Sequence, residues 1–140
     1  MIEILVVEDT ELYRQAITRI IHGRADLRIL AEVTDGLEAV RLAEELQPDL
    51  ILLDIRLPNL NGIEAARKIR SITPQSNIIF VTQELSPEFI SEAFSLGGKG
   101  YVAKIDLGRD LLIGIDAVFQ GKTFISSSLE QNGFKPKAKT

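Results

Sequence analysis

The sequence predicts an α/β domain in which helices cover both faces of a parallel sheet. Three observations lead to this fold class. Short apolar runs alternate with longer segments of helical periodicity, most of the runs lack interleaved polar residues, and turn residues separate the two kinds of segment. Such alternation is typical of successive βαβ units, and continuous apolar runs are typical of strands buried on both faces.

Five apolar runs are the predicted strands. Four are short and uninterrupted, whereas one has Arg28 and Glu32 interleaved and is therefore expected at an edge of the sheet. In chain order the runs cover residues 4–7, 27–33, 50–53, 78–81 and 101–103.

Between the strands, apolar residues recur at intervals of three and four, as on one face of an amphipathic helix. The first helix is expected to start near Glu11, and Ser86 is expected to cap a later one. Gly121 follows the last helix as a predicted C-terminal cap. The apolar stripes are Leu37, Val40, Ala43 and Leu46, then Ile63, Ala66 and Ile69, and finally Leu111, Leu112, Ile115, Val118 and Phe119.

Length and composition fit one globular domain. The 140 residues are 45% apolar and 26% charged, which suits a folded chain with one core. The net charge of -4 argues against binding nucleic acid through this domain by bulk electrostatics. No run approaches the roughly 18 apolar residues of a membrane span. We therefore expect a cytoplasmic protein without membrane contact.

The periodic pattern is lost near Ser126. We expect one domain over residues 1–125 and a linker or flexible C-terminal tail over residues 126–140. Lys135, Lys137 and Lys139 lie in this tail, and three lysines among polar residues are more typical of a solvated terminus than of a nucleic-acid contact.

Polar residues follow the four central predicted strands. Glu8 and Asp9 come after the first, Asp54 after the third, Thr82 after the fourth and Lys104 after the fifth. Ligands of an open parallel sheet bind beyond the carboxyl ends of its strands, so these side chains are expected at one rim. Each alone has a structural explanation, such as helix capping by Asp9. Together they supply the groups that phosphoryl chemistry needs.

Three carboxylates at one rim repel one another, and a hard divalent cation with oxygen ligands is the usual relief. Magnesium fits best because it takes one or two protein carboxylates and leaves positions for phosphate oxygens. Manganese is an expected substitute. The sequence therefore predicts a magnesium site formed by Glu8, Asp9 and Asp54.

These residues stand in motifs that resemble the receiver domains of bacterial two-component response regulators, over about residues 2–122. The resemblance implies a flavodoxin-like (βα)5 fold, a doubly wound, five-stranded parallel sheet of order 2-1-3-4-5. Residues 121–126 are similar to the NarL/LuxR class, whose receivers often precede a helix-turn-helix domain. The motifs are Val6-Val7-Glu8-Asp9, Leu52-Leu53-Asp54-Ile55-Arg56-Leu57-Pro58 through Asn61-Gly62, Val81-Thr82 and Gly100-Tyr101-Val102-Ala103-Lys104.

The resemblance also implies a role for each residue. Asp54 would accept the phosphoryl group, and Lys104 and Thr82 would contact its oxygens. Thr82 and Tyr101 would form the switch pair. The metal ligands would be Glu8, Asp9, Asp54 and the backbone carbonyl of Arg56.

The implied function is that of a phosphoacceptor switch and not of an enzyme. The partner would be a sensor histidine kinase or a phosphotransfer protein, and phosphorylation would change the conformation and favour a homodimer. The expected output is transcription through a DNA-binding domain that this sequence does not contain. The alternative is a stand-alone or degenerate receiver that acts as a protein-interaction module.

Two other functions are disfavoured by the residues themselves. A flavodoxin-like electron carrier needs a Ser/Thr/Gly-rich phosphate cradle after the first strand, where Glu8 and Asp9 would repel a phosphate. A haloacid-dehalogenase-type phosphatase needs a second acid two residues after its nucleophile, and Arg56 occupies that position.

Several residues depart from the family pattern or lack an assigned role. Gln83 stands where a small residue is usual, so its bulk is expected to change the phosphoryl lifetime. Ile105 stands where proline is frequent, and no cis peptide bond is expected without it. Tyr13 is interpreted as a packing residue and His22 as a surface residue.

Overall fold

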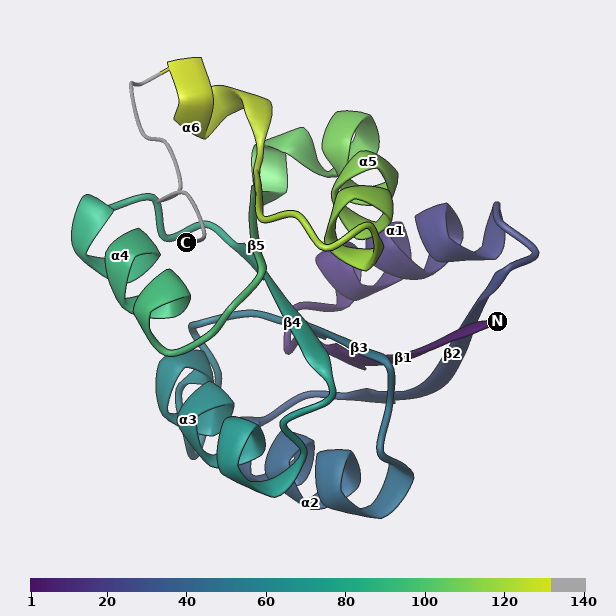
Figure 1. The fold of residues 1–140 in the computed structure, drawn as a ribbon. Helices are drawn as coiled ribbons and strands as arrows, with labels where there is room; N and C mark the ends of the chain where they lie inside the picture. Colours follow the sequence, from purple (N-terminus) through teal and green to yellow (C-terminus); the bar gives the residue numbers. More distant parts are fainter. Residues whose placement is uncertain (132–140) are drawn as a thin grey trace.

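The computed structural model describes residues 1–131, which form a parallel sheet between two layers of helices (Figure 1). The strands are β1 (Ile2–Val7), β2 (Leu27–Val33), β3 (Leu50–Leu53), β4 (Asn77–Thr82), β5 (Gly100–Ala103) and β6 (Phe124–Ile125). The helices are α1 (Glu11–His22), α2 (Gly36–Leu46), α3 (Gly62–Ile72), α4 (Pro87–Ser95), α5 (Leu107–Phe119) and α6 (Ser127–Gln131), with a 3-10 turn η1 (Lys104–Asp106).

The sheet has the order β2-β1-β3-β4-β5-β6, and all neighbouring strands are parallel. The predicted flavodoxin-like order 2-1-3-4-5 is confirmed, with β2 at the edge. The five predicted strands are all present, and a short additional strand, β6, pairs with β5. The backbone N–H groups of Phe124 and Ser126 donate to the carbonyls of Lys99 and Tyr101, each at 3.0 Å. Two residues are too short to show a strand pattern.

Both faces of the sheet are buried. Helices α2, α3 and α4 cover one face, and α1 and α5 cover the other (Figure 1). Leu5 and Phe80 point into the first core, whereas their neighbours Ile4 and Val81 point into the second. Successive side chains of a strand alternate between faces. This alternation between two apolar layers explains why the strands read as uninterrupted apolar runs.

The helix ends follow the predicted capping residues. The Ser86 hydroxyl accepts a hydrogen bond from the backbone N–H of Phe89, as expected of an N-cap. Gly121 follows the end of α5 with a φ of 84°, a left-handed conformation that glycine adopts without steric cost. Phe119, which we placed on the buried stripe of this helix, is instead exposed at its last position.

Helix α6 lies within the segment predicted as a linker or tail. Its first N–H groups are capped from the β5–α5 region, because Asp110 accepts from Ser127 N at 2.7 Å and Asp106 accepts from Ser128 N at 3.0 Å. The domain boundary at residue 125 stays a prediction, and the tail lysines lie outside the described residues. Within residues 1–131, no helix combines the length and apolarity needed to cross a membrane.

Candidate functional site

Four strands deliver the predicted site residues to one edge of the sheet. Parallel pairing aligns Val7 of β1 with Leu53 of β3, so the residues that follow them, Glu8 and Asp54, leave the sheet side by side. Lys104 follows β5 and begins η1. The sequence-based expectation that these side chains share the carboxyl edge therefore agrees with their positions.

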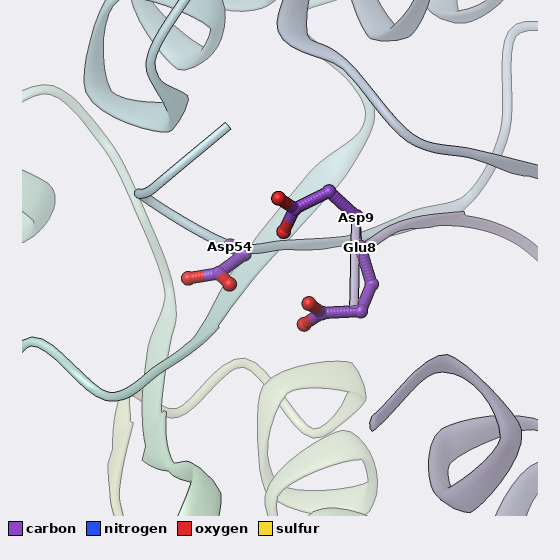
Figure 2. A group of neighbouring side chains, drawn as sticks. All are labelled: Glu8, Asp9 and Asp54. Atoms are coloured by element: carbon purple, nitrogen blue, oxygen red, sulfur yellow. The ribbon is translucent and has the colours of Figure 1, made fainter. Parts of the chain in front are cut away.

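The carboxylates of Glu8, Asp9 and Asp54 gather around a common space (Figure 2). Each contributes an oxygen, and these oxygens lie within 4.8 Å of one another. Glu8 and Asp54 are buried, whereas Asp9 is exposed. The group thus combines buried charge with access from solvent, as a cation site requires.

Lys104 neutralises the buried part of this acidic group. Its Nζ lies 2.7 Å from Asp54 Oδ2 and 2.9 Å from Glu8 Oε1, and its side chain is only 3% exposed. The other Asp54 oxygen accepts a hydrogen bond of 2.7 Å from the backbone N–H of Ile55. Asp54 is thereby fixed by one charged and one neutral donor.

Gly62 allows the first turn of α3 to approach the Asp54 backbone. Its N–H donates to the Ile55 carbonyl at 2.7 Å. A Cβ atom at this position would lie 2.0 Å from the carbonyl oxygen of Asp54, closer than any side chain can be accommodated without backbone movement. Glycine is therefore required at position 62 because the Asp54 backbone lies too close for any side chain.

Burial and neighbouring charges shift the pKa values within the site. Burial raises the pKa of Glu8, and the negative charge of Asp54 adds to this effect, while Lys104 and the Thr10 N–H oppose it. Burial alone would lower the pKa of Lys104, but its interactions with the carboxylates of Asp54 and Glu8 outweigh burial and raise it. Lys104 is therefore a cation at neutral pH.

One atom of the site lacks a partner that satisfies it. Glu8 Oε1 is buried and accepts no hydrogen bond, since its contact with Lys104 Nζ has the distance of an ion pair without hydrogen-bond geometry. Buried carboxylate oxygens without hydrogen bonds are costly. An oxygen-liganded cation or its bound water would supply the missing interaction, so the three carboxylates fit a magnesium or manganese ion.

Thr82 and Tyr101 form a separate group beside the carboxylates. Thr82 Oγ1 accepts a hydrogen bond of 3.1 Å from the N–H of Glu84, and the Tyr101 hydroxyl donates to the Glu84 carbonyl. Both side chains are buried, and burial, followed by the charges of Glu84 and Asp54, raises the pKa of Tyr101. The hydrogen bonds of this pair converge on Glu84, which sequence reasoning did not single out.

Arg56 extends away from the carboxylates. Its exposed guanidinium donates to the side chain of Glu84, which joins the β3–α3 loop to the β4–α4 loop. The predicted role of its backbone carbonyl as a metal ligand stays a prediction.

Tyr13 belongs to the surroundings of Lys104, which sequence reasoning missed. Lys104 Nζ lies 4.3 Å from the centroid of its ring, and its hydroxyl accepts a hydrogen bond of 3.1 Å from Gln83 Nε2. The ring also packs against the core between the sheet and the α1/α5 layer, as its packing interpretation predicts. The position of Tyr13 on α1 indicates a packing residue and gives no sign of the contact with Lys104.

Comparison with known families agrees with this geometry. The model of the response regulator receiver domain matches residues 4–113. The chain belongs to this family. A receiver is a signalling module and not an enzyme, and the acidic cluster occupies the position expected of a phosphoacceptor site.

The relatives of this receiver include longer regulators. It is 32% identical over 131 residues to the response regulator GacA of Pseudomonas aeruginosa, covering 94% of this chain and 61% of GacA. It is 29% identical to the transcriptional regulatory protein YxjL of Bacillus subtilis, covering 99% of this chain and 66% of that protein. The chain thus spans less than two thirds of these relatives.

A solved structure shares both the fold and the class. The crystal structure of a LuxR-family two-component response regulator from Aurantimonas superposes with a TM-score of 0.87 at 33% identity, covering 94% of each chain. This similarity agrees with the predicted NarL/LuxR resemblance.

Proposed function

We propose that this receiver is a phosphoacceptor switch in which Asp54 takes a phosphoryl group from the phosphohistidine of a sensor histidine kinase or a phosphotransfer protein. The observation that carries the proposal is the ion pair of 2.7 Å between Asp54 and Lys104, beside two further carboxylates. A buried salt bridge between one acid and one base could have a purely structural role. A buried acid that shares its lysine with an unsatisfied second acid indicates a site prepared for another ligand.

The transfer balances without any further reactant. An oxygen of the Asp54 carboxylate forms the new bond to phosphorus while the bond between phosphorus and the donor imidazole nitrogen breaks, and the imidazole keeps the electron pair. Because a carboxylate is a weak nucleophile toward an anionic phosphoryl group, catalysis depends on positioning and charge neutralisation. Lys104 is placed to supply one positive charge at the accepting oxygen.

Magnesium, or manganese in its place, would be held by Glu8, Asp9, Asp54 and the backbone carbonyl of Arg56. When bound, the ion neutralises charge on the phosphoryl oxygens. Glu8 is suited to hold a bound water or the ion because one of its buried oxygens accepts no hydrogen bond. Asp9 contributes an exposed carboxylate through which the ion can enter.

The switch would act through Thr82 and Tyr101. The Thr82 hydroxyl accepts from Glu84 N, so its own proton is available to a phosphoryl oxygen. Tyr101 is already buried, and phosphorylation would therefore stabilise this position of the ring. A shift from 1:99 to 99:1 needs about 5.5 kcal/mol, more than one charge-assisted hydrogen bond supplies, so Lys104 must contribute as well.

The proposed output is control of transcription, with a homodimer forming on phosphorylation. The relatives that support this output are named transcriptional regulators and are longer than this chain. A separate DNA-binding region would be required, since the net charge of -4 does not favour DNA binding by the receiver itself.

Phosphorylation can be tested with a small phosphodonor. Incubation with acetyl phosphate and magnesium is expected to add the mass of one phosphoryl group, and Asp54→Asn is expected to abolish the addition. Peptide mapping after borohydride reduction locates the acyl phosphate. Incorporation at another residue, or equal incorporation in the variant, would refute the assignment of Asp54.

A further inference from the structure

A tyrosine contacts the lysine of the site, and a glutamine binds the hydroxyl of that tyrosine. The ring of Tyr13, on the first turns of α1, lies 4.3 Å from Lys104 Nζ, and Gln83, at the start of the β4–α4 loop, donates a hydrogen bond of 3.1 Å to the Tyr13 hydroxyl. This hydrogen bond joins residues that are 70 positions apart in the chain. We refer to Tyr13 and Gln83 together as the clasp.

The Tyr13 ring adds a third contact to the ammonium group that two carboxylates already hold. Asp54 and Glu8 contact Lys104 Nζ at 2.7 Å and 2.9 Å, and the aromatic ring contributes a third attraction through its negative face. A lysine side chain has a flexible four-carbon stem, so with two carboxylates alone its ammonium group could move toward either one. An aromatic face that attracts the ammonium restricts that motion.

Gln83 in turn restricts the ring. Tyr13 is only partly buried, with one edge against the core and its hydroxyl directed to the loop after β4. A tyrosine ring in such a position keeps its orientation when its hydroxyl has a fixed partner. Gln83 is exposed and makes this hydrogen bond across the site, which assigns to its side chain a role other than bulk.

We propose that Tyr13 is a positioning residue for Lys104 and that Gln83 acts through Tyr13. The inference rests on the proposed function, in which Lys104 must direct its charge to the phosphoryl group entering at Asp54. The ring holds the ammonium at that position before the donor arrives. Preorganised charge costs no reorganisation during the reaction, so the clasp accelerates phosphorylation.

The position of the ring can be measured without any phosphorylation. A ring 4.3 Å from Nζ shifts the ε-methylene proton resonances of Lys104 upfield. We expect this upfield shift in the wild-type NMR spectrum, its retention in Tyr13→Phe and its loss in Tyr13→Leu. The shift also persists in Asp54→Asn if the ring itself holds the lysine. If the Lys104 ε-methylene resonances of the wild-type protein are not shifted, the positioning role of Tyr13 is refuted, whether or not Asp54 is phosphorylated.

The rate of phosphorylation by acetyl phosphate, at saturating magnesium, tests the functional role. Tyr13→Leu is expected to lower the rate constant about tenfold, which corresponds to ~1.4 kcal/mol. Tyr13→Phe and Gln83→Met, which each break the hydrogen bond, are expected to lower it about threefold. The double variant Tyr13→Phe/Gln83→Met is expected to show the same threefold loss, because each single change already removes the one hydrogen bond that the two residues share.

A matched control lies on the same helical turn. Leu12→Ala changes a side chain that is 71% exposed and is expected to leave both the rate and the Lys104 resonances unchanged. The positioning role would be overturned if the rate losses of the two single variants multiplied in the double variant. It would also be overturned if Tyr13→Leu lost the resonance shift but kept the wild-type rate. A wild-type protein that shows the resonance shift but takes up no phosphate would instead refute the proposed function.

Discussion

Polar side chains are buried both at the amino ends of the strands (the amino edge) and at their carboxyl ends (the carboxyl edge), but their hydrogen bonding differs. At the amino edge, Ser76 precedes β4, and its hydroxyl donates to the Pro48 carbonyl at 2.5 Å and pairs with the Thr73 hydroxyl at 2.7 Å. At the carboxyl edge, Glu8 and Asp54 share one lysine, and one buried Glu8 oxygen accepts no hydrogen bond.

The difference separates structural polar groups from functional ones. Neutral hydroxyls that satisfy one another stabilise a fold at little cost, whereas an ionised carboxylate without full pairing destabilises it. The amino edge is complete as it stands. At the carboxyl edge one buried oxygen accepts no hydrogen bond, and the three carboxylates there could bind a metal ion.

The largest expected effect comes from removing the shared cation. Lys104→Met keeps much of the side-chain volume but removes the charge beside Asp54, and the phosphorylation rate is expected to fall about 100-fold, as for loss of one preorganised donor at a reacting oxygen. The measurement is the initial rate with acetyl phosphate and magnesium, with the amide NMR spectrum as a control for folding. A rate within twofold of wild type would make Lys104 a structural residue only.

A substitution at the opposite edge is expected to affect stability and leave function unchanged. Ser76→Ala leaves the buried Pro48 carbonyl without its donor, which is expected to cost about 2 kcal/mol of the free energy of unfolding. Urea denaturation measures this loss. The phosphorylation rate is expected to match wild type, and a large decrease would show that the two edges are not independent.

The smallest effect is a gain in stability at the site itself. Burial raises the folded-state pKa of Glu8 above its ordinary value of 4.5, so its carboxylate costs stability above the folded-state pKa and costs nothing below the unfolded-state value. Glu8→Gln is therefore expected to raise the free energy of unfolding of the metal-free protein by about 1 kcal/mol at neutral pH.

Thermal unfolding in chelator measures this gain, which corresponds to roughly 3 °C. The difference between the variant and wild type is expected to shrink as the pH falls toward 4.5, because protonation of Glu8 removes the same cost in wild type. A variant that is less stable than wild type at neutral pH would indicate that the pair with Lys104 stabilises the fold.

The sequence was sufficient to predict the sheet and the residues at its active edge. Uninterrupted apolar runs result from burial between two helical layers, and parallel strands place their following residues together, so Glu8, Asp54 and Lys104 could be grouped without coordinates. Strand β6 could not be predicted, since two residues carry no periodicity and pair only because β5 presents a free edge.

The side-chain contacts around Lys104 were also beyond sequence reasoning. Tyr13 has the spacing of a core residue on α1, and nothing local indicates that its hydroxyl meets Gln83. Glu84 likewise shows no pattern, yet its backbone receives the hydrogen bond of Tyr101 and donates to Thr82. Such contacts depend on how loops from distant parts of the chain meet, which spacing along the sequence does not determine.

The most direct test of Asp54 as the phosphoacceptor is an NMR titration with magnesium and beryllofluoride, a mimic of the phosphoryl group on Asp54. We expect chemical-shift changes at Thr82 and Tyr101 in the wild-type protein, and none beyond those of magnesium alone in Asp54→Asn. Identical changes in both proteins would contradict this assignment, because the mimic would then act without the carboxylate that Lys104 contacts.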